Sequence, residues 1–276
     1  MIQSAIEYER DLTLAEIVDL DNTLSLKELM CISRSLADIG HGDTVTYSPK
    51  VFIPLTRLCR DVCHYCTFAT VPRQIERPYM QIEEVLELCR KGIAAGCREA
   101  LFTLGERPEV RYSAARNALK KMGFSTTLEY LSVVAERVLE ETGLLPHINA
   151  GCMDAIELAR LRSVSASMGI MLESSSSRLC GKGMPHYGSP DKIPGKRLRT
   201  IELAGRAKIP LTSGILIGIG ETRLERIESL LELRSKHRKY NHLQEIIVQN
   251  FRAKPDTLMA KSPEPHLDEL LWTISI

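Results

Sequence analysis

From about residue 47 onward, short aliphatic runs alternate with longer stretches whose apolar residues recur at helical spacing. The short runs predict β-strands and the longer stretches predict α-helices, because each structure has its own apolar period. The expected strands are Val51–Leu55, Glu99–Thr103, Leu145–Asn149, Ser167–Leu172, Leu211–Ile217 and Glu245–Asn250. Two expected helices have apolar stripes that start at Ile82 and Leu128. Further helices are expected at Asp154–Arg162, Lys196–Lys208 and Arg223–Lys236, and a last one near Leu267.

This alternation predicts an α/β protein with a parallel sheet and right-handed crossovers. The sheet either stays open or curls. We expect a partial or full TIM-type (β/α) barrel of at least six strands, because chemically unusual residues follow strand after strand. Before it, Thr13-Leu-Ala-Glu16 and Ser25-Leu-Lys-Glu28 have the pattern of capping boxes. Residues 1–46 are therefore expected to form a helical extension and residues 47–276 a barrel domain whose C-terminal part is incomplete.

Composition narrows the classes of function. Of 276 residues, 44% are hydrophobic and 26% are charged, which is typical of globular domains. A net charge of +1 gives no electrostatic reason to expect a nucleic acid or an anionic membrane as partner. The start of the chain lacks the layout of a signal peptide, and no apolar run is long enough to span a bilayer. We expect a cytoplasmic protein.

Three of the eight cysteines, Cys59, Cys63 and Cys66, follow the first predicted strand with the spacing Cys-x3-Cys-x2-Cys. A zinc site would need a fourth ligand, and His64 is too tightly tethered within this loop to serve easily. A redox Cys-x-x-Cys pair would leave Cys59 without a role. A 4Fe–4S cluster on three cysteines uses all of them and keeps one iron open for an exogenous ligand. We favour the cluster over these two alternatives.

Acidic residues follow the second and fourth predicted strands. Gly105 lets the backbone come close to a ligand, and Glu106 offers a carboxylate that suits an ammonium group. Glu173 can accept two hydrogen bonds from a ribose diol. The same residues also suit a solvated turn and a helix N-cap region, so both interpretations stay open.

A glycine-rich turn, Gly218–Gly220, follows the fifth predicted strand. Bare backbone there can lie against a flat ring such as adenine, with Ile217 or Ile219 as an apolar floor. The spacing does not match a dinucleotide-binding fingerprint. The alternative is a tight barrel turn in which Glu221 starts the next helix.

Two amides and one loop are candidates for substrate contacts. Asn149 and Asn250 end the third and sixth predicted strands, so we expect them to point over the rim toward a substrate. The polar loop 182–192 is long enough to cover the barrel mouth. Its His186 and Tyr187 are candidates for substrate hydrogen bonding or proton transfer, although such a pair in a loop usually does neither.

These motifs, and the order in which they follow the strands, resemble those of the radical S-adenosylmethionine (SAM) enzymes. The resemblance covers this chain from about Val51 to Phe251. More narrowly, four runs are similar to the CofG type, the deazaflavin-forming synthases that also occur as the N-terminal half of fused FbiC proteins. The runs are Val51-Phe-Ile-Pro-Leu-Thr-Arg-Leu-Cys59, His64-Tyr-Cys-Thr-Phe68, Gly105-Glu-Arg-Pro-Glu109 and Lys182-Gly-Met-Pro-His-Tyr-Gly-Ser-Pro-Asp191.

The resemblance implies a set of cofactor contacts. The three motif cysteines would hold a 4Fe–4S cluster whose fourth iron chelates the amino and carboxylate groups of SAM. Arg197, in the helix before the fifth strand, would reach the SAM carboxylate. The remaining SAM contacts would come from the Tyr65 backbone and from Gly105, Glu106, Glu173, Ser213, Gly218, Ile219 and Gly220.

The resemblance also implies a reaction. An electron from an external donor would enter the cluster, and SAM would yield a 5′-deoxyadenosyl radical. That radical would act on a tyrosine–ribitylaminouracil adduct made by a CofH-type partner enzyme or fused domain. Ring closure with loss of ammonia would then give the deazaflavin chromophore. The alternatives are CofH-type coupling, another radical SAM reaction such as sulfur insertion, and a zinc- or cluster-stabilised binding module without catalysis.

Overall fold

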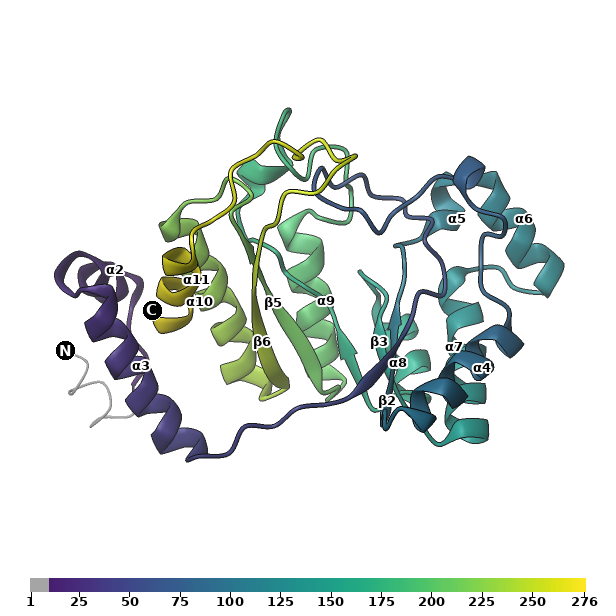
Figure 1. The fold of residues 1–276 in the computed structure, drawn as a ribbon, viewed down its shortest axis with the longest axis horizontal. Helices are drawn as coiled ribbons and strands as arrows, with labels where there is room; N and C mark the ends of the chain where they lie inside the picture. The colour runs from purple at the N-terminus through teal and green to yellow at the C-terminus, as the bar shows by residue number, and fades with distance from the viewer. Residues whose placement is uncertain (1–9) are drawn as a thin grey trace.

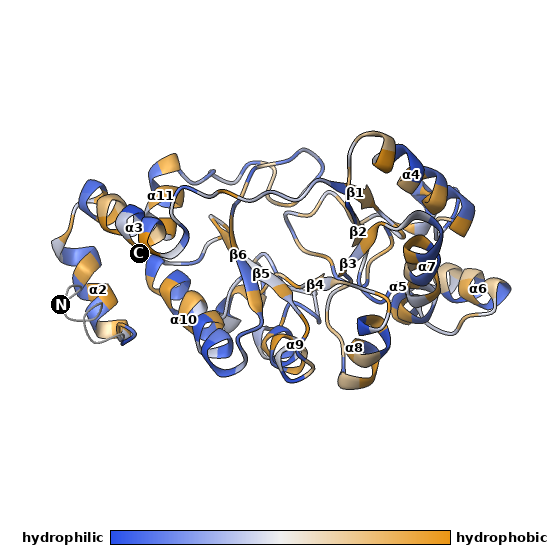
Figure 2. Ribbon diagram, turned by 90° about the horizontal axis from the view of Figure 1, so that it is seen from below, coloured by the Kyte–Doolittle hydropathy of each residue, from blue (hydrophilic) through white to orange (hydrophobic). Residues whose placement is uncertain are grey.

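One parallel sheet organises the protein, whose computed structural model describes residues 10–276. Six strands are hydrogen-bonded in chain order, each parallel to the next. Figure 1 shows the sheet between its helices, and Figure 2 shows the strands following an arc with helices outside it. Within residues 10–276, the sixth strand does not pair with the first, so this is a partial barrel. The strands are β1 (Lys50–Ile53), β2 (Glu99–Thr103), β3 (Leu145–Asn149), β4 (Ser167–Gly169), β5 (Leu211–Ile217) and β6 (Leu243–Asn250).

The helices bury apolar stripes against the outer face of this sheet, as amphipathic helices do. Cys89 on α4 and Leu131 on α7, for example, are both fully buried in the main core. Among residues 10–276, no helix combines the length and the apolar character needed to cross a membrane. The helices around the sheet are α4 (Ile82–Ala94), α5 (Pro108–Arg111), α6 (Ser113–Met122), α7 (Thr127–Thr142), α8 (Ala155–Arg162), α9 (Pro194–Arg206), α10 (Arg223–Tyr240) and α11 (Leu267–Ser275).

Strand burial follows position in the sheet. All seven residues of β5 are buried, whereas edge strand β6 leaves Ile246 and Ile247 partly exposed. A strand covered on both faces favours a continuous aliphatic run, and β5 has one. The predicted α/β class with at least six parallel strands is confirmed.

Two helices precede the barrel, α2 (Leu14–Thr23) and α3 (Leu26–His41). Both begin with the predicted capping boxes at Thr13 and Ser25. They pack on α10 and α11 through an apolar cluster that includes Trp272. Figure 1 shows the following segment, 42–49, running beneath the sheet to β1. The division at residue 46 stays a prediction, and residues 1–9 of the predicted extension lie outside the described part.

The structure differs from the predicted elements at several points. Strand β1 is Lys50–Ile53 rather than Val51–Leu55, and β6 begins at Leu243 rather than Glu245. Strand β4 ends at Gly169 rather than Leu172, because the chain turns away and Glu173 adopts φ +64°, a left-handed conformation. Only an isolated bridge to Ile215 continues the pairing with β5. Helices α5 and α6 were not predicted, since α6 buries only Ala115 and Leu119 and so has a short apolar stripe.

Candidate functional site

A cavity of about 470 Å³ lies at the carboxyl ends of the strands. Its volume falls within the range of small-molecule sites. The cysteine loop after β1 forms one wall, and the ends of the other strands form the rest. The predicted site residues that line it are Cys59, Cys63, Tyr65, Cys66, Gly105, Glu106, Asn149, Glu173, Arg197 and Asn250. The structure thus brings together predicted residues from the ends of five strands, β1, β2, β3, β4 and β6, and one residue, Arg197, from helix α9.

The three motif cysteines are free thiols on this wall. Burial raises the pKa of the Cys59 thiol to about 12 and raises that of Cys63 as well. Both groups are therefore protonated near neutral pH until a metal displaces the proton. A metal centre here would bind with release of protons.

The spacing of the sulfurs bears on which metal fits. Within residues 10–276, the group of three ligand side chains with donor atoms all within 4.8 Å of one another is Glu106, Cys152 and Asp191, not the motif cysteines. Thiolates around one tetrahedral zinc at about 2.3 Å would lie about 3.8 Å apart. The three motif sulfurs are not gathered within that span in this structure. The acidic group itself is already neutralised, because the Asp191 carboxylate pairs with Arg60 and Lys196.

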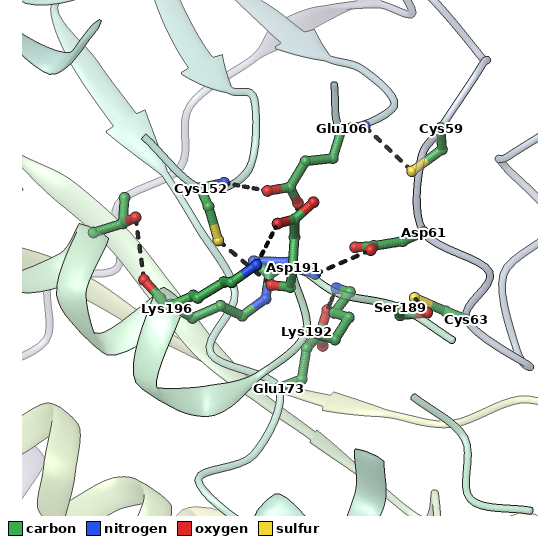
Figure 3. A network of polar contacts seen from close by, with 12 residues as sticks. Cys59, Asp61, Cys63, Glu106, Cys152, Glu173, Ser189, Asp191, Lys192 and Lys196 are labelled. Carbon is green, nitrogen blue, oxygen red and sulfur yellow. Dashed lines mark hydrogen bonds and ion pairs between the residues drawn. The ribbon is translucent and has the colours of Figure 1, made fainter. Parts of the chain in front are cut away.

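Glu106 links the end of β2 to two other walls of the cavity. Its carboxylate accepts a hydrogen bond from the Cys152 N–H at 2.6 Å and lies 3.8 Å from the Arg197 guanidinium. Its own N–H donates to the Cys59 sulfur at 3.2 Å. Burial raises the pKa of Glu106, and Arg197 opposes that rise. Figure 3 shows Glu106 between Cys59 and Cys152.

Gly105 allows the end of β2 to pack closely against the loop that carries the motif cysteines. A Cβ atom at this position would lie 1.9 Å from the Leu58 carbonyl oxygen. No side chain can be accommodated, because that oxygen belongs to the neighbouring backbone. The glycine therefore lets the end of β2 sit directly against the cysteine loop.

Two buried charged groups in this cavity have an atom without a hydrogen-bond partner among the described residues. They are Asp61, through Oδ2, and Arg197, through Nε. Both side chains are almost fully buried. Burial raises the pKa of Asp61. For Arg197, burial acts to lower the pKa, but Glu106 and other anionic groups raise it overall. Buried unpaired polar atoms are rare in folded proteins, so this pair points to a ligand.

A second buried charge pair, Lys192 and Glu173, also lines the cavity. The Lys192 Nζ donates to the Glu173 carboxylate at 2.5 Å. Burial acts to raise the pKa of Glu173, but Lys192 and Arg197 lower it overall. Glu173 is therefore ionised at neutral pH and can accept further hydrogen bonds.

Some predicted cofactor contacts lie away from the cavity surface. Ser213 is fully buried in β5, and its hydroxyl donates to the Ile170 carbonyl at 2.8 Å. In the turn Gly218–Gly220, the first two N–H groups donate to the Glu221 carboxylate at 2.7 and 2.9 Å. Ile219 packs in an apolar cluster with Phe251. Two N–H groups of this turn are thus occupied within the protein, and the next helix begins at Arg223; the role of the turn in cofactor binding stays a prediction.

The two candidates from loop 182–192 also lie outside the cavity lining. His186 is buried, with Nε2 3.0 Å from the Tyr65 hydroxyl. Burial, followed by Lys192, lowers the pKa of His186 to about 4, so the ring is neutral at pH 7. Tyr187 is 48% exposed. Neither position favours direct contact with a bound substrate.

Several lining residues were not singled out from the sequence. Apolar surface comes from Met171, Leu216 and Phe251, and charge comes from Asp61 and Lys192. Strand alternation could have indicated Leu216, because every second residue of β5 faces the barrel interior. Asp61 and Lys192 are brought together only by folding.

Comparison with known proteins places these features in context. The family model described as Radical SAM superfamily matches residues 53–233. An FO synthase of Streptomyces avermitilis is 51% identical over 263 residues, which cover 94% of this chain and 30% of that protein. A 7,8-didemethyl-8-hydroxy-5-deazariboflavin synthase of Methanopyrus kandleri is 50% identical over 231 residues, covering 84% of this chain and 69% of that protein.

A solved structure shares the fold. The crystal structure of methylornithine synthase (PylB) aligns with a TM-score of 0.71 and 21% identity, covering 99% of this chain and 77% of that one. At this identity the likeness concerns the fold alone. The chain spans about three-tenths of the length of the FO synthases that it matches.

Proposed function

Because this chain belongs to the radical SAM superfamily, we propose that Cys59, Cys63 and Cys66 hold a 4Fe–4S cluster beside a SAM site. The observation that carries the proposal is one cavity lined by three free thiols and by buried groups of both charges. When bound, this pair of groups supplies a carbon-centred radical by one-electron cleavage of SAM. The residues described below bind, orient and enclose it.

The amino-acid end of SAM carries an ammonium and a carboxylate, and the cavity has buried partners for both. Glu106 and the unpaired Oδ2 of Asp61 can accept hydrogen bonds from the ammonium. The unpaired Nε of Arg197 can donate to the carboxylate. Charge-assisted hydrogen bonds of this kind are stronger than neutral ones. The proposed ligand would therefore relieve the burial cost of these side chains.

The nucleoside end of SAM is assigned to Glu173 and to the apolar residues that line the cavity. Glu173 is ionised and fixed by Lys192, so its free oxygen can accept a hydrogen bond from a ribose hydroxyl. Met171, Leu216 and Phe251 provide apolar surface for a base. Ile219, a predicted floor residue, packs in one apolar cluster with Leu216 and Phe251 and so supports this surface from behind.

The product is inferred from the relatives' names. We propose that the chain forms 7,8-didemethyl-8-hydroxy-5-deazariboflavin, with ring closure and ammonia loss from the tyrosine–ribitylaminouracil adduct. Asn149 and Asn250 line the cavity and are candidates to contact that substrate. A CofH-type enzyme or fused domain would supply the adduct, and an external donor would supply electrons. The reducing cytoplasm would keep the ligating thiols available.

Anaerobic reconstitution tests the proposal. The expected result is about four irons and four sulfides per chain, a paramagnetic signal that changes with SAM, and deazaflavin formed from the adduct with 5′-deoxyadenosine. One zinc per chain with no response to SAM would support a binding module instead. Formation of 5′-deoxyadenosine only with CofH-type substrates, tyrosine and the ribitylaminouracil, would indicate the coupling reaction.

A further inference from the structure

Each motif cysteine sulfur accepts one hydrogen bond from the surrounding protein. The Cys59 sulfur accepts from the Glu106 N–H at 3.2 Å, and the Cys66 sulfur accepts from the Ala69 N–H at 3.5 Å. Those two donors are backbone amides. The Cys63 sulfur differs, because its donor is the hydroxyl of Ser189 at 3.6 Å, from a segment 126 residues later. One of these three bonds therefore depends on the identity of a side chain.

The hydroxyl of Ser189 is oriented by its other contacts. Its oxygen accepts a hydrogen bond from the Val62 N–H at 3.0 Å, and the serine is only 3% exposed. Because one lone pair is taken by this amide, the hydroxyl hydrogen is left to point toward Cys63. Gly188, at φ +80°, permits the approach, since a Cβ there would lie 2.9 Å from a Val62 methyl. Figure 3 shows Ser189 beside Cys63.

Ser189 belongs to a segment, 185–191, that we call the clasp. Six consecutive residues of the cysteine loop are hydrogen-bonded to it. The bonds join Arg60 to the Asp191 carboxylate, Asp61 to the Asp191 N–H, Val62 and Cys63 to Ser189, the His64 N–H to the Pro185 carbonyl, and Tyr65 to His186. A hydroxyl held from both sides in this way keeps its place beside the sulfur.

Hydrogen bonds to the sulfurs of an iron–sulfur centre stabilise its reduced, more negative state and so raise its reduction potential. We propose that Ser189 is a positioning residue that sets the potential of the cluster through its hydrogen bond to Cys63, with the clasp fixing its hydroxyl. The proposal rests on the proposed function. One electron from an external reductant enters the cluster, and no atom is transferred.

Redox titration of the anaerobically reconstituted full chain, followed by paramagnetic resonance with dithionite as reductant, tests this role. Ser189→Ala should give a more negative midpoint potential than the wild type, and Ser189→Thr, which keeps the hydroxyl, should restore it. Ser167→Ala is the matched control, because Ser167 is also a buried serine but bonds His147 at the other end of the barrel. Its potential should equal that of the wild type.

Each of the remaining outcomes supports or refutes the proposed role of Ser189. If Ser189→Ala fails to retain iron while Ser189→Thr loads fully, the hydroxyl is required at the ligand, which supports the role. A loaded Ser189→Ala with the wild-type potential overturns it, and so does loss of iron in both variants or an equal shift in Ser167→Ala. A wild-type chain that takes up no cluster would instead refute the proposed function.

Discussion

The two ends of the barrel differ in how their buried polar groups are satisfied. At the cavity end, Asp61 and Arg197 each keep an atom without a partner among the described residues. At the opposite end, His147 bonds the Ser167 hydroxyl at 2.7 Å, and Lys50 pairs with Glu99. Two imidazole rings near that end, those of His237 and His242, each keep an Nδ1 without a partner in the part of the chain that the structure describes. Both ends are made by the same strands. The difference is therefore one of charge: the unpartnered atoms at the cavity end belong to an acidic and a basic side chain, which suits a charged ligand, whereas Lys50 and Glu99 at the opposite end pair with each other.

Loss of one thiol ligand should have the largest effect on the cavity end. Cys63→Ala is expected to leave no measurable SAM cleavage, because two thiolates cannot hold the cluster. Iron content and 5′-deoxyadenosine formation measure it. Cys89→Ala is the control, since Cys89 is buried in the main core and its loss should cost only about 1 kcal/mol of stability. Full activity of Cys63→Ala would contradict the ligand assignment.

Neutralising the unpaired carboxylate should affect ligand binding more than folding. Asp61→Asn keeps an acceptor for the Asp191 N–H but loses the free anionic oxygen. SAM affinity, measured by calorimetry on the reconstituted protein, should fall by about tenfold to a hundredfold, the worth of a charged hydrogen bond. The free energy of unfolding should not fall. The exposed Asp38→Asn serves as control, and unchanged affinity in Asp61→Asn would remove it from the site.

At the paired end, the expected effect is on the pH dependence of stability. Burial, followed by Lys50, lowers the pKa of His147 to about 4. As the pH falls, the imidazole of the unfolded chain is protonated at a higher pH than the buried ring of the folded protein. The stability that depends on neutral His147 is therefore fully present at pH 7 and is lost as the pH falls from about 6.5 toward 4. The loss should reach about 2 kcal/mol at pH 5.

His147→Gln should flatten this part of the unfolding curve, measured with denaturant at several pH values. SAM affinity at pH 7.5 should not change. An unaltered pH profile in His147→Gln would show that another group is responsible.

The smallest effect is expected at the Lys50–Glu99 pair. Its side chains remain 27% and 21% exposed, so water screens the interaction. Lys50→Met should change the free energy of unfolding by less than about 1 kcal/mol. A loss of several kcal/mol would show that this ion pair contributes much more to folding stability than its exposure suggests.

Local pattern predicted the scaffold better than the site. Strands β2, β3 and β5 have the predicted bounds, because the first two end at a polar residue and the third ends just before a glycine. The cysteine loop and Glu106 were also predicted to share one rim of the barrel, since strand ends in a parallel sheet meet there, and both line the cavity.

The pattern of apolar and polar residues could not predict which segments, far apart in the sequence, contact each other. Asp191 meets Asp61 across 130 residues, and Ser189 meets Cys63 across 126. Whether Gly218–Gly220 faces a ligand or closes on Glu221 depends on a few ångströms of backbone path. Periodicity carries no information on such distances.

Among the described residues, β1 and β6 are not paired with each other. A closed ring of hydrogen bonds would fix the circumference of the barrel through strand number and shear. Without such a ring, β1 and β6 are each held by one neighbouring strand. Amide hydrogens along the free side of β6 should accordingly exchange with solvent faster than those of β2 to β5.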